Sequence, residues 1–388
     1  MAVGLGKAAL LGAVLVGCGG ESQTPGGAEP AAASVEAVRV GADGPAGAVL
    51  LTVNAVTASD LRVEREGALS VHAVAGEVQG VRLDRTGAPT GAAQRIAAVE
   101  GRVRALVAGA SAGRVAVAWL RTFDGHARVE RALGAGRAPA FGPPVELERW
   151  PASDRDAALL IGAQDLALRV TPTGDFRLLH RASPVSCEGS AECATYRHSG
   201  LGEDTGERRS SASLAAPDVC PWALPGFVEA SGRMYYGLCA LVDGAPLSTL
   251  YLLQPEPQYA QAERALADCR PLGVLAAPDG TGTEAALFAA DCPEGRVAVS
   301  LGAPGVSVRP VGPVQAPSCS AAGPVLHVGA LRVPLPAPRD RLDGFLPTAV
   351  APAGARVLWT GDVFLVAELT GSQLTVRAWS CEAAAGLR

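Results

Sequence analysis

The feature that most constrains this chain is a two-residue alternation of apolar and polar side chains, which recurs from about residue 46 onward. Leu61-Arg62-Val63-Glu64 and Val81-Arg82-Leu83-Asp84 show it clearly. Alternation with this period is typical of β-strands. Glycine-containing turns separate such segments, at Thr86-Gly87, Asp124-Gly125, Thr173-Gly174, Asp243-Gly244, Asp279-Gly280 and Thr370-Gly371. Helical periodicity is scarce, and residues 258–268 are expected to form only one or two turns within a loop. The sequence therefore predicts an all-β protein.

An internal repeat narrows the architecture. The pentapeptide Gly-Arg-Val-Ala-Val occurs at 113–117 and again at 295–299, and looser copies begin at Gly67, Gly232 and Gly354. The spacing of the units in the first half matches the roughly 40–50 residues of a four-stranded propeller blade. We therefore expect residues 46–388 to form a β-propeller of about seven four-stranded blades.

A pair of β-sandwich domains is the alternative architecture, with a break near residues 183–219. The aromatic content of 4% is low for a propeller core, and the repeat blurs between residues 180 and 290. Both observations favour the sandwich alternative, whereas the repeat favours the propeller.

The N-terminus has the layout of an export signal. Lys7 precedes an uninterrupted apolar run, residues 8–17, and the run ends in Leu15-Val16-Gly17 immediately before Cys18. A run of this length fits the apolar part of a secretory signal, whereas crossing a bilayer takes about 20 residues. The alternative is a chance apolar N-terminus followed by an ordinary buried thiol.

Leu15-Val16-Gly17-Cys18 resembles the lipobox of bacterial lipoproteins, in which the cysteine is lipidated and becomes the new N-terminus. The resemblance implies that residues 1–17 are a signal peptide and that acyl chains such as palmitate on Cys18 anchor the protein to a membrane. Gly19 and Gly20 follow Cys18 without an aspartate. In bacteria with two membranes, that pattern implies the outer membrane. Residues 18–45, rich in glycine, alanine and proline, are predicted to be the lipidated cysteine and a flexible linker.

Eight cysteines remain once Cys18 is assigned to the lipid. An even number in an exported protein points to four disulfides, although eight cysteines allow 105 pairings. Nearest-neighbour pairing is our prediction, and it gives Cys187–Cys193, Cys220–Cys239, Cys269–Cys292 and Cys319–Cys381. Zinc held by Cys187, Cys193 and His198 is a weaker alternative, because zinc sites usually pair cysteines at closer spacing.

Residues 183–219 are the one long irregular stretch, and a loop of this length in a compact domain is usually functional or disordered. We predict a cysteine-containing loop insertion here. Tyr196, Arg197 and His198 lie in it near acidic residues, and we predict that they bind a ligand or partner.

Catalytic motifs are weak throughout the sequence. Residues 109–113 match G-x-S-x-G as letters, but a strand-like segment follows where a hydrolase needs a helix. His72 and His327 sit within apolar strands and are expected to be packed rather than catalytic. The sequence contains no metal or cofactor motif. Its 33 basic and 38 acidic residues give a slightly acidic chain, which does not favour binding to nucleic acid.

The sequence thus predicts a lipid-anchored cell-envelope protein that acts as a binding or assembly module, with no catalytic residue, metal or cofactor assigned. Its expected partners are the membrane, through the anchor, and an envelope protein or polysaccharide. The alternative is an envelope enzyme, a polysaccharide hydrolase or lyase, on the same propeller, because a fold does not decide a function.

Overall fold

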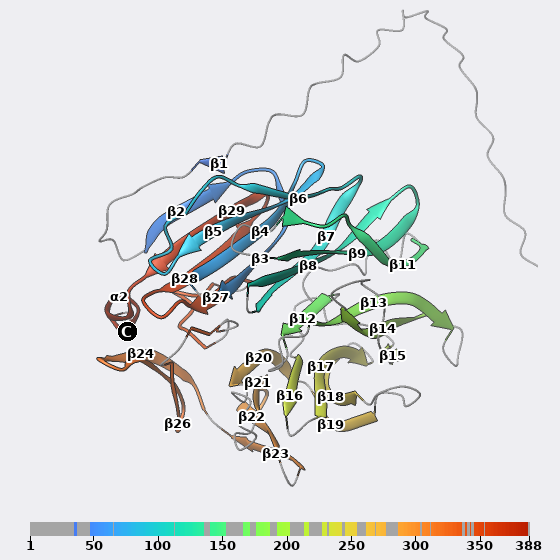
Figure 1. Ribbon diagram of the computed structural model, residues 1–388. Helices are drawn as coiled ribbons and strands as arrows, with labels where there is room; N and C mark the ends of the chain where they lie inside the picture. Colours follow the sequence, from blue (N-terminus) through green and yellow to red (C-terminus); the bar gives the residue numbers. More distant parts are fainter. Residues whose placement is uncertain are drawn as a thin grey trace, which may run out of the picture. The chain divides into compact units, whose positions relative to one another are not determined.

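The computed structural model contains β-strands almost throughout, as the sequence predicts (Figure 1). It describes residues 35–36, 47–64, 66–111, 113–135, 140–152, 166–170, 176–186, 192–201, 213–216, 227–230, 233–242, 245–253, 261–267, 269–276, 286–302, 305–310, 312–335, 338–339, 342, 345–352 and 354–386. For residues 192–198, and for most strand residues from 213 to 310, the description covers the backbone alone. The predicted signal peptide and Cys18 lie outside the described residues.

The described strands form seven antiparallel sheets, which we name by their order in the chain. The terminal sheet contains, in spatial order, β1 (Val35–Glu36), β2 (Ala48–Val53), β29 (Gln373–Trp379), β28 (Phe364–Thr370) and β27 (Arg356–Trp359). The first sheet contains β3 (Val56–Glu64), β4 (Gly67–Val74), β5 (Glu77–Asp84) and β6 (Gln94–Ala98). The second sheet contains β7 (Arg102–Ser111), β8 (Arg114–Phe123), β9 (His126–Ala135), β10 (Ala140–Phe141) and β11 (Val145–Pro151).

The remaining sheets repeat the same up-and-down order. The third sheet contains β12 (Leu166–Val170), β13 (Phe176–Ser186), β14 (Glu192–Leu201) and β15 (Ser213–Ala216). The fourth contains β16 (Phe227–Ala230), β17 (Arg233–Val242), β18 (Ala245–Leu253) and β19 (Gln261–Ala267). The fifth contains β20 (Arg270–Ala276), β21 (Ala286–Cys292), β22 (Gly295–Gly302) and β23 (Gly305–Pro310). The sixth contains β24 (Val314–Ser320), β25 (Gly323–Val328) and β26 (Leu331–Pro334).

The terminal sheet joins two distant parts of the chain. Strand β2 pairs with β29 in an antiparallel ladder that sets Val53 opposite Leu374 (Figure 1, blue beside red). A hydrogen bond from the amide of Val56 to the carbonyl of Ser372 (2.8 Å) continues this contact into β3. The residues that follow the predicted linker are therefore held by strands near the C-terminus.

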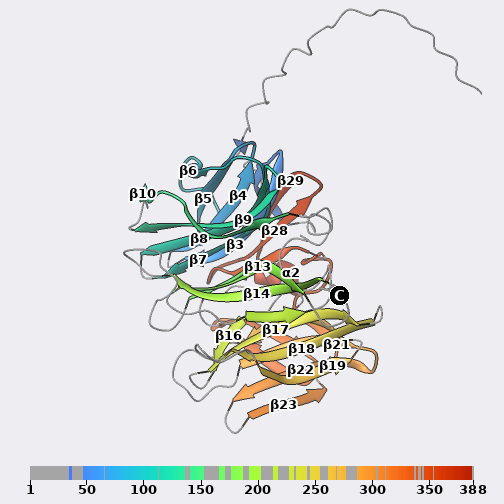
Figure 2. The same ribbon diagram turned by 90° about the vertical axis from the view of Figure 1, so that its right-hand side faces the viewer.

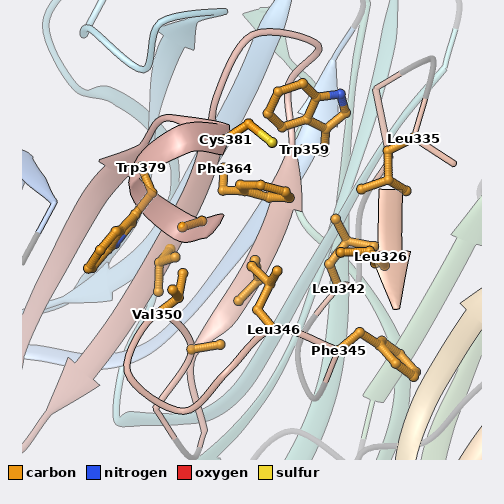
Figure 3. Packing of buried hydrophobic residues seen from close by; sticks show 14 of the residues in the cluster. Leu326, Leu335, Leu342, Phe345, Leu346, Val350, Trp359, Phe364, Trp379 and Cys381 are labelled. Atoms are coloured by element: carbon orange, nitrogen blue, oxygen red, sulfur yellow. The ribbon is translucent and has the colours of Figure 1, made fainter. Parts of the chain in front are cut away.

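Neighbouring sheets share apolar layers. One layer lies between the terminal and first sheets, another between the first and second, and a third between the second and third. A further layer joins the sixth sheet to the terminal sheet, where Trp359 and Phe364 pack with ring centroids 4.8 Å apart (Figure 3). Apolar side chains exclude water at each contact, so burial on both sheet faces is the main stabilising term of this region.

Burial on both faces corrects one expectation from the sequence. Alternation in Leu61-Arg62-Val63-Glu64 predicts a strand whose charged positions face solvent, yet Arg62 is only 4% exposed. The charged positions of β3 lie against the second sheet rather than against water, because the first sheet is covered on both faces.

Turn chemistry agrees with the sequence where the structure describes it. Asp124 and Gly125, between β8 and β9, have positive φ values of 48° and 66°. Two positive φ values in a two-residue hairpin are what the Asp-Gly pair favours.

Residues 183–219 differ from the predicted loop insertion. Strands β13 and β14 extend far into this segment and pair along most of their length (Figure 2). The polar composition suggested a loop, but pairing with the apolar strand β13 supplies backbone partners that a local reading of β14 does not reveal. The predicted helical turns at 258–268 are likewise wrong, because strand β19 occupies this segment and pairs with β18.

Two disulfides are present among the described residues, and both join partners that nearest-neighbour pairing predicts. Cys269–Cys292 connects the start of β20 to the end of β21, and Cys319–Cys381 connects β24 to the short helix α2 (Cys381–Ala385). Ser380 caps α2 by accepting a hydrogen bond from the amide of Ala383 (3.1 Å). The other two predicted pairs stay predictions, because Cys187 and Cys220 lie outside the described residues and only the backbone of Cys193 and Cys239 is described.

Candidate functional site

Buried charge is concentrated where strands β3, β7 and β27 meet. Asp60 of β3 is 1% exposed, and its Oδ2 accepts hydrogen bonds from Nε of Arg62 (2.8 Å) and from the backbone amide of Ala108 on β7 (2.9 Å). Nε of Arg356 on β27 lies 3.7 Å from the other carboxylate oxygen. We name these four residues the Asp60 centre. It links the first, second and terminal sheets through one carboxylate.

The chemistry of the Asp60 centre favours a structural role. Two guanidinium groups and a main-chain N–H surround one carboxylate, so the charge that burial would otherwise penalise is compensated. A carboxylate held by such donors is poorly placed to act as a free base. The contacts instead fix the position of β3 relative to β7 in the neighbouring sheet, since sliding either strand by one residue would break them.

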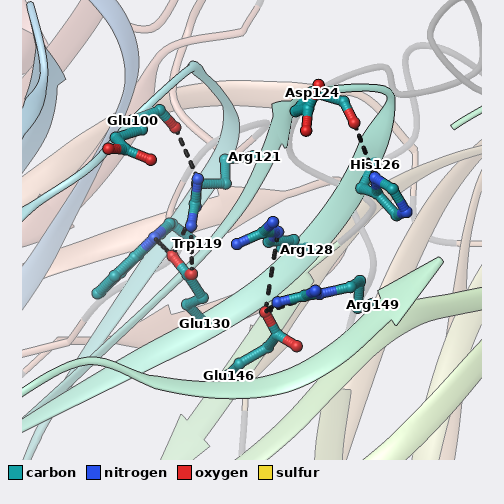
Figure 4. Close-up of polar contacts among 9 residues, drawn as sticks. All are labelled: Glu100, Trp119, Arg121, Asp124, His126, Arg128, Glu130, Glu146 and Arg149. Atoms are coloured by element: carbon teal, nitrogen blue, oxygen red, sulfur yellow. Dashed lines mark hydrogen bonds and ion pairs between the residues drawn. The ribbon is translucent and has the colours of Figure 1, made fainter. Parts of the chain in front are cut away.

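A second buried polar cluster lies within the second sheet, around Glu130 (Figure 4). Glu130 Oε2 accepts hydrogen bonds from the indole Nε1 of Trp119 and from Nε of Arg121, both at 2.8 Å. Nη2 of Arg121 donates to Oε1 of the same carboxylate (2.7 Å), and its Nη1 donates to the backbone oxygen of Glu100 (2.8 Å). The hydrogen bonds to Glu130 raise the pKa of Arg121 above its ordinary value. We name these residues the Glu130 cluster.

Nearer the surface, Glu146 faces two arginines in the same view (Figure 4). Nη2 of Arg149 lies 2.9 Å from its Oε2, and Nε of Arg128 lies 3.8 Å from the same oxygen. Arg149 is 48% exposed, so this pair contributes little to stability. His126 contacts the backbone oxygen of Asp124 within the hairpin (2.7 Å).

The predicted binding residues lie in the middle of strand β14. Tyr196 is opposite Arg181, Arg197 is opposite His180 on one side and Ser213 on the other, and His198 is opposite Leu179. Their side chains are outside the described part of the structure. They belong to the third sheet, whereas the Asp60 centre joins the first, second and terminal sheets.

The histidines have different surroundings. His72 is fully buried in β4, as its apolar strand predicts. His180 is also fully buried, with Nδ1 2.8 Å from the backbone oxygen of Arg181 and Nε2 3.2 Å from Oγ of Ser199. His327 is half-buried on β25, with Nε2 2.8 Å from Oγ of the exposed Ser318.

One other sequence expectation can be placed. Residues 109–113 span the connection between β7 and β8, so the G-x-S-x-G string lies in a β-hairpin and not before a helix. In the part of the chain that the structure describes, no group of three or more histidine, cysteine or acidic side chains could hold a metal ion. No helix among the described residues combines the length and apolar character that crossing a bilayer requires.

The sequence alone did not identify Asp60 or Glu130 as buried. Each is an acidic residue in a strand, which is an ordinary surface pattern. The available signal was an arginine two residues from Asp60 and another, Arg121, diagonal to Glu130 across the β8–β9 hairpin, where both side chains face one side of the sheet.

Comparisons with known proteins give limited likeness. No protein-family model matches the sequence, and no curated protein matches it. Among solved structures, the chain is similar to one from a study of two prolyl endopeptidases, with a TM-score of 0.39, 9% identity, and coverage of 84% of this chain and 50% of that one. It is also similar to a bifunctional GH43-CE protein of Bacteroides eggerthii, with a TM-score of 0.30, 9% identity, and coverage of 82% and 44%. The chain thus spans about half the length of each.

Proposed function

We propose that this chain is an exported, lipid-anchored protein of the cell envelope, which uses a seven-bladed β-propeller as a binding or assembly module. Cys18 carries the lipid, residues 1–17 are removed on export, and the outer membrane of a two-membrane bacterium is the destination. The two disulfides agree with export, because such bonds persist in oxidising compartments.

The sheet order supports the propeller. The seven described sheets follow one another in the chain, most contain four strands, and five of them pack in series through shared apolar layers. The pairing of β2 with β29 carries the proposal, because it lets an early strand complete the last sheet of the chain. A circular array closed in this way leaves only short edges open to pairing with other chains.

The same pairing bears on the anchor. Strand β1, which lies within the predicted linker of residues 18–45, pairs with β2 and sets Val35 opposite Val53. The terminal sheet, which contains β1 and β2, is then the part of the fold that follows the anchor in the chain, and the other sheets are available to a partner.

Radiolabelled palmitate tests the anchor. The wild-type protein is expected to incorporate the label and to sediment with membranes, whereas Cys18→Ser is expected to do neither. Gly19→Ser, next to the modified position, is the matched control and is expected to behave as the wild type. An unmodified Cys18 thiol in a cytosolic fraction would contradict the proposal.

The binding role is tested at β14. Capture of envelope proteins or polysaccharide on the immobilised protein is expected to weaken when Tyr196, Arg197 and His198 are all changed to alanine. Arg332→Ala, an exposed change on β26, is the control. Unaltered capture by the triple variant would remove these residues from the proposed contact. The enzyme alternative draws no support from Asp60 or Glu130, because two arginines contact the first carboxylate and Arg121 contacts both oxygens of the second.

A further inference from the structure

His72 differs from every other polar group described above in its lack of protein partners. It lies in the middle of β4 and is 0% exposed, and neither ring nitrogen has a hydrogen-bond partner among the described protein atoms. Gln79 lies opposite it on β5 and is near enough to raise the pKa of His72 slightly against the effect of burial, but its amide donates to Glu77 (2.8 Å) and makes no hydrogen bond of good geometry with the imidazole. A fully buried imidazole without a partner resists taking up a proton, because its cation would be poorly solvated.

Ser70 shares this situation. It is two residues from His72, is also 0% exposed, and its hydroxyl has no hydrogen-bond partner among the described protein atoms. The register of β4 with β5 runs without a bulge from residue 67 to 74, so alternate residues share one face. Ala68 and Val74, on the face that Ser70 and His72 share, belong to the apolar layer against the terminal sheet. Both polar side chains therefore sit in the interface between the first and terminal sheets.

Charged groups that face this interface are already paired. On the first sheet they are Glu77 and Arg95, whose Oε1 and Nε are 3.4 Å apart. From the terminal sheet, Arg356 faces it and lies 3.7 Å from Asp60. The apolar residues of the terminal sheet that fill the rest of this layer include Leu358, Leu365, Ala367, Leu374 and Val376. Among the described residues, no acidic side chain on this face is left to pair with a protonated His72.

We infer that Ser70 and His72 make the interface between the first and terminal sheets an acid-sensitive joint, which loosens when His72 binds a proton. The joint lies in the layer to which β2 contributes, and β2 is the strand that connects the linker to the fold. Acidification would thus act first where the two ends of the described chain meet. The inference does not depend on the proposed anchor or partner.

The direction of the effect follows from linkage. Burial lowers the pKa of His72 from 6.5 to about 4, and the nearby Gln79 side chain opposes this only in part. The unfolded chain, with an ordinary histidine, binds more protons between these two values, so stability is full above pH 6.5 and falls as the pH drops toward 4. At pH 5 this single group would raise the unfolding equilibrium constant about 30-fold relative to pH 7.5.

The experiment compares wild type with His72→Gln, whose side chain does not titrate. Urea unfolding of each full-length protein is measured at pH 7.5 and pH 5. The wild-type unfolding constant is expected to rise about 30-fold more than that of His72→Gln. His126→Gln, which alters a histidine in the β8–β9 hairpin, is the control and should keep the wild-type response. Equal responses of wild type and His72→Gln would overturn the inference.

Hydrogen exchange on the wild type tests the same joint without a variant. At pH 5, exchange corrected for its intrinsic pH dependence should accelerate in β4, β5, β28 and β29 more than in β8. If His72→Gln fails to fold, this measurement decides alone. Uniform protection at both pH values, or equal acceleration in β8, would refute the acid-sensitive joint.

Discussion

The first sheet buries polar side chains on both of its faces, and the two faces differ in the hydrogen bonds that these side chains make. Toward the second sheet, Oδ2 of the buried Asp60 accepts hydrogen bonds from Arg62 and from the amide of Ala108, and Oδ1 has no hydrogen bond within the described structure but lies 3.7 Å from Nε of Arg356. Toward the terminal sheet, Ser70 and His72 are equally buried, yet their side chains have no hydrogen-bond partner among the described protein atoms. Both faces are otherwise lined by similar aliphatic side chains.

Buried polar groups with partners and those without partners therefore affect stability differently. Compensated groups such as Asp60 specify how two sheets align, because alternatives leave a charge without a partner. Uncompensated groups lower stability at neutral pH and make it depend on solution conditions. The second-sheet face is therefore expected to be sensitive to mutation, and the terminal-sheet face to be sensitive to pH.

The largest effect is expected when the compensated face is broken. Asp60→Ala leaves Arg62 and Arg356 facing one another without the carboxylate between them, and it leaves the Ala108 amide without its acceptor. Removing one partner of a buried charge pair costs about 3–5 kcal/mol. Urea denaturation at pH 7.5 measures the loss in unfolding free energy.

Asp60→Asn is the matched control, because it keeps the shape and one acceptor oxygen while removing the charge. It is expected to cost about 1–3 kcal/mol, less than alanine. A cost below about 1 kcal/mol for Asp60→Ala would mean that the Asp60 centre does not stabilise the contact of the three sheets.

A smaller loss in unfolding free energy is expected from a substitution in the second sheet. Glu130→Gln keeps one oxygen to accept from Trp119 but loses the charge that both Arg121 nitrogens contact. The expected cost is about 1–3 kcal/mol, since hydrogen bonds to charged groups are the stronger ones. Thermal unfolding followed by tryptophan fluorescence measures it.

Glu100→Gln serves as the comparison for that experiment. Glu100 accepts a hydrogen bond from Arg121 through its backbone oxygen, which the substitution preserves, and its carboxylate charge acts on Arg121 less than Glu130 does. Its stability is expected to equal that of the wild type. Similar losses for Glu100→Gln and Glu130→Gln would show that overall charge, and not the hydrogen bonds of Glu130, sets the stability of this sheet.

Local patterns in the sequence were sufficient for the all-β class and the Asp124-Gly125 hairpin, because each depends on neighbours in the chain. The count of cysteines predicts that disulfides form but leaves 105 pairings open, so the two described disulfides match a nearest-neighbour choice that the sequence did not require. Strand β14 was missed because its polar composition resembles a loop, and its partners on β13 and β15 are tertiary information.

The Asp60 centre could not be predicted for a related reason. Its contacts span residues 60, 108 and 356, and sequence spacing does not indicate which strands become neighbours. Alternation in β3 correctly indicated a strand, but it could not reveal that the polar face is covered by a second sheet. The burial of His72 was predicted from its apolar strand, whereas its lack of a partner depends on the sheet packed against it.

The smallest change in stability is expected from a substitution on the face of the first sheet toward the terminal sheet, where the buried polar groups have no partner among the described protein atoms. Ser70→Ala removes a buried hydroxyl that has no partner in the described structure and keeps nearly the same volume, so it is expected to stabilise the protein by up to about 1 kcal/mol. Because the hydroxyl does not titrate in this range, the gain should be equal at pH 7.5 and pH 5, unlike the change produced by His72→Gln. Urea midpoints at both pH values measure it. A loss above about 1 kcal/mol would show that Ser70 is compensated after all, and the contrast between the two faces would then rest on His72 alone.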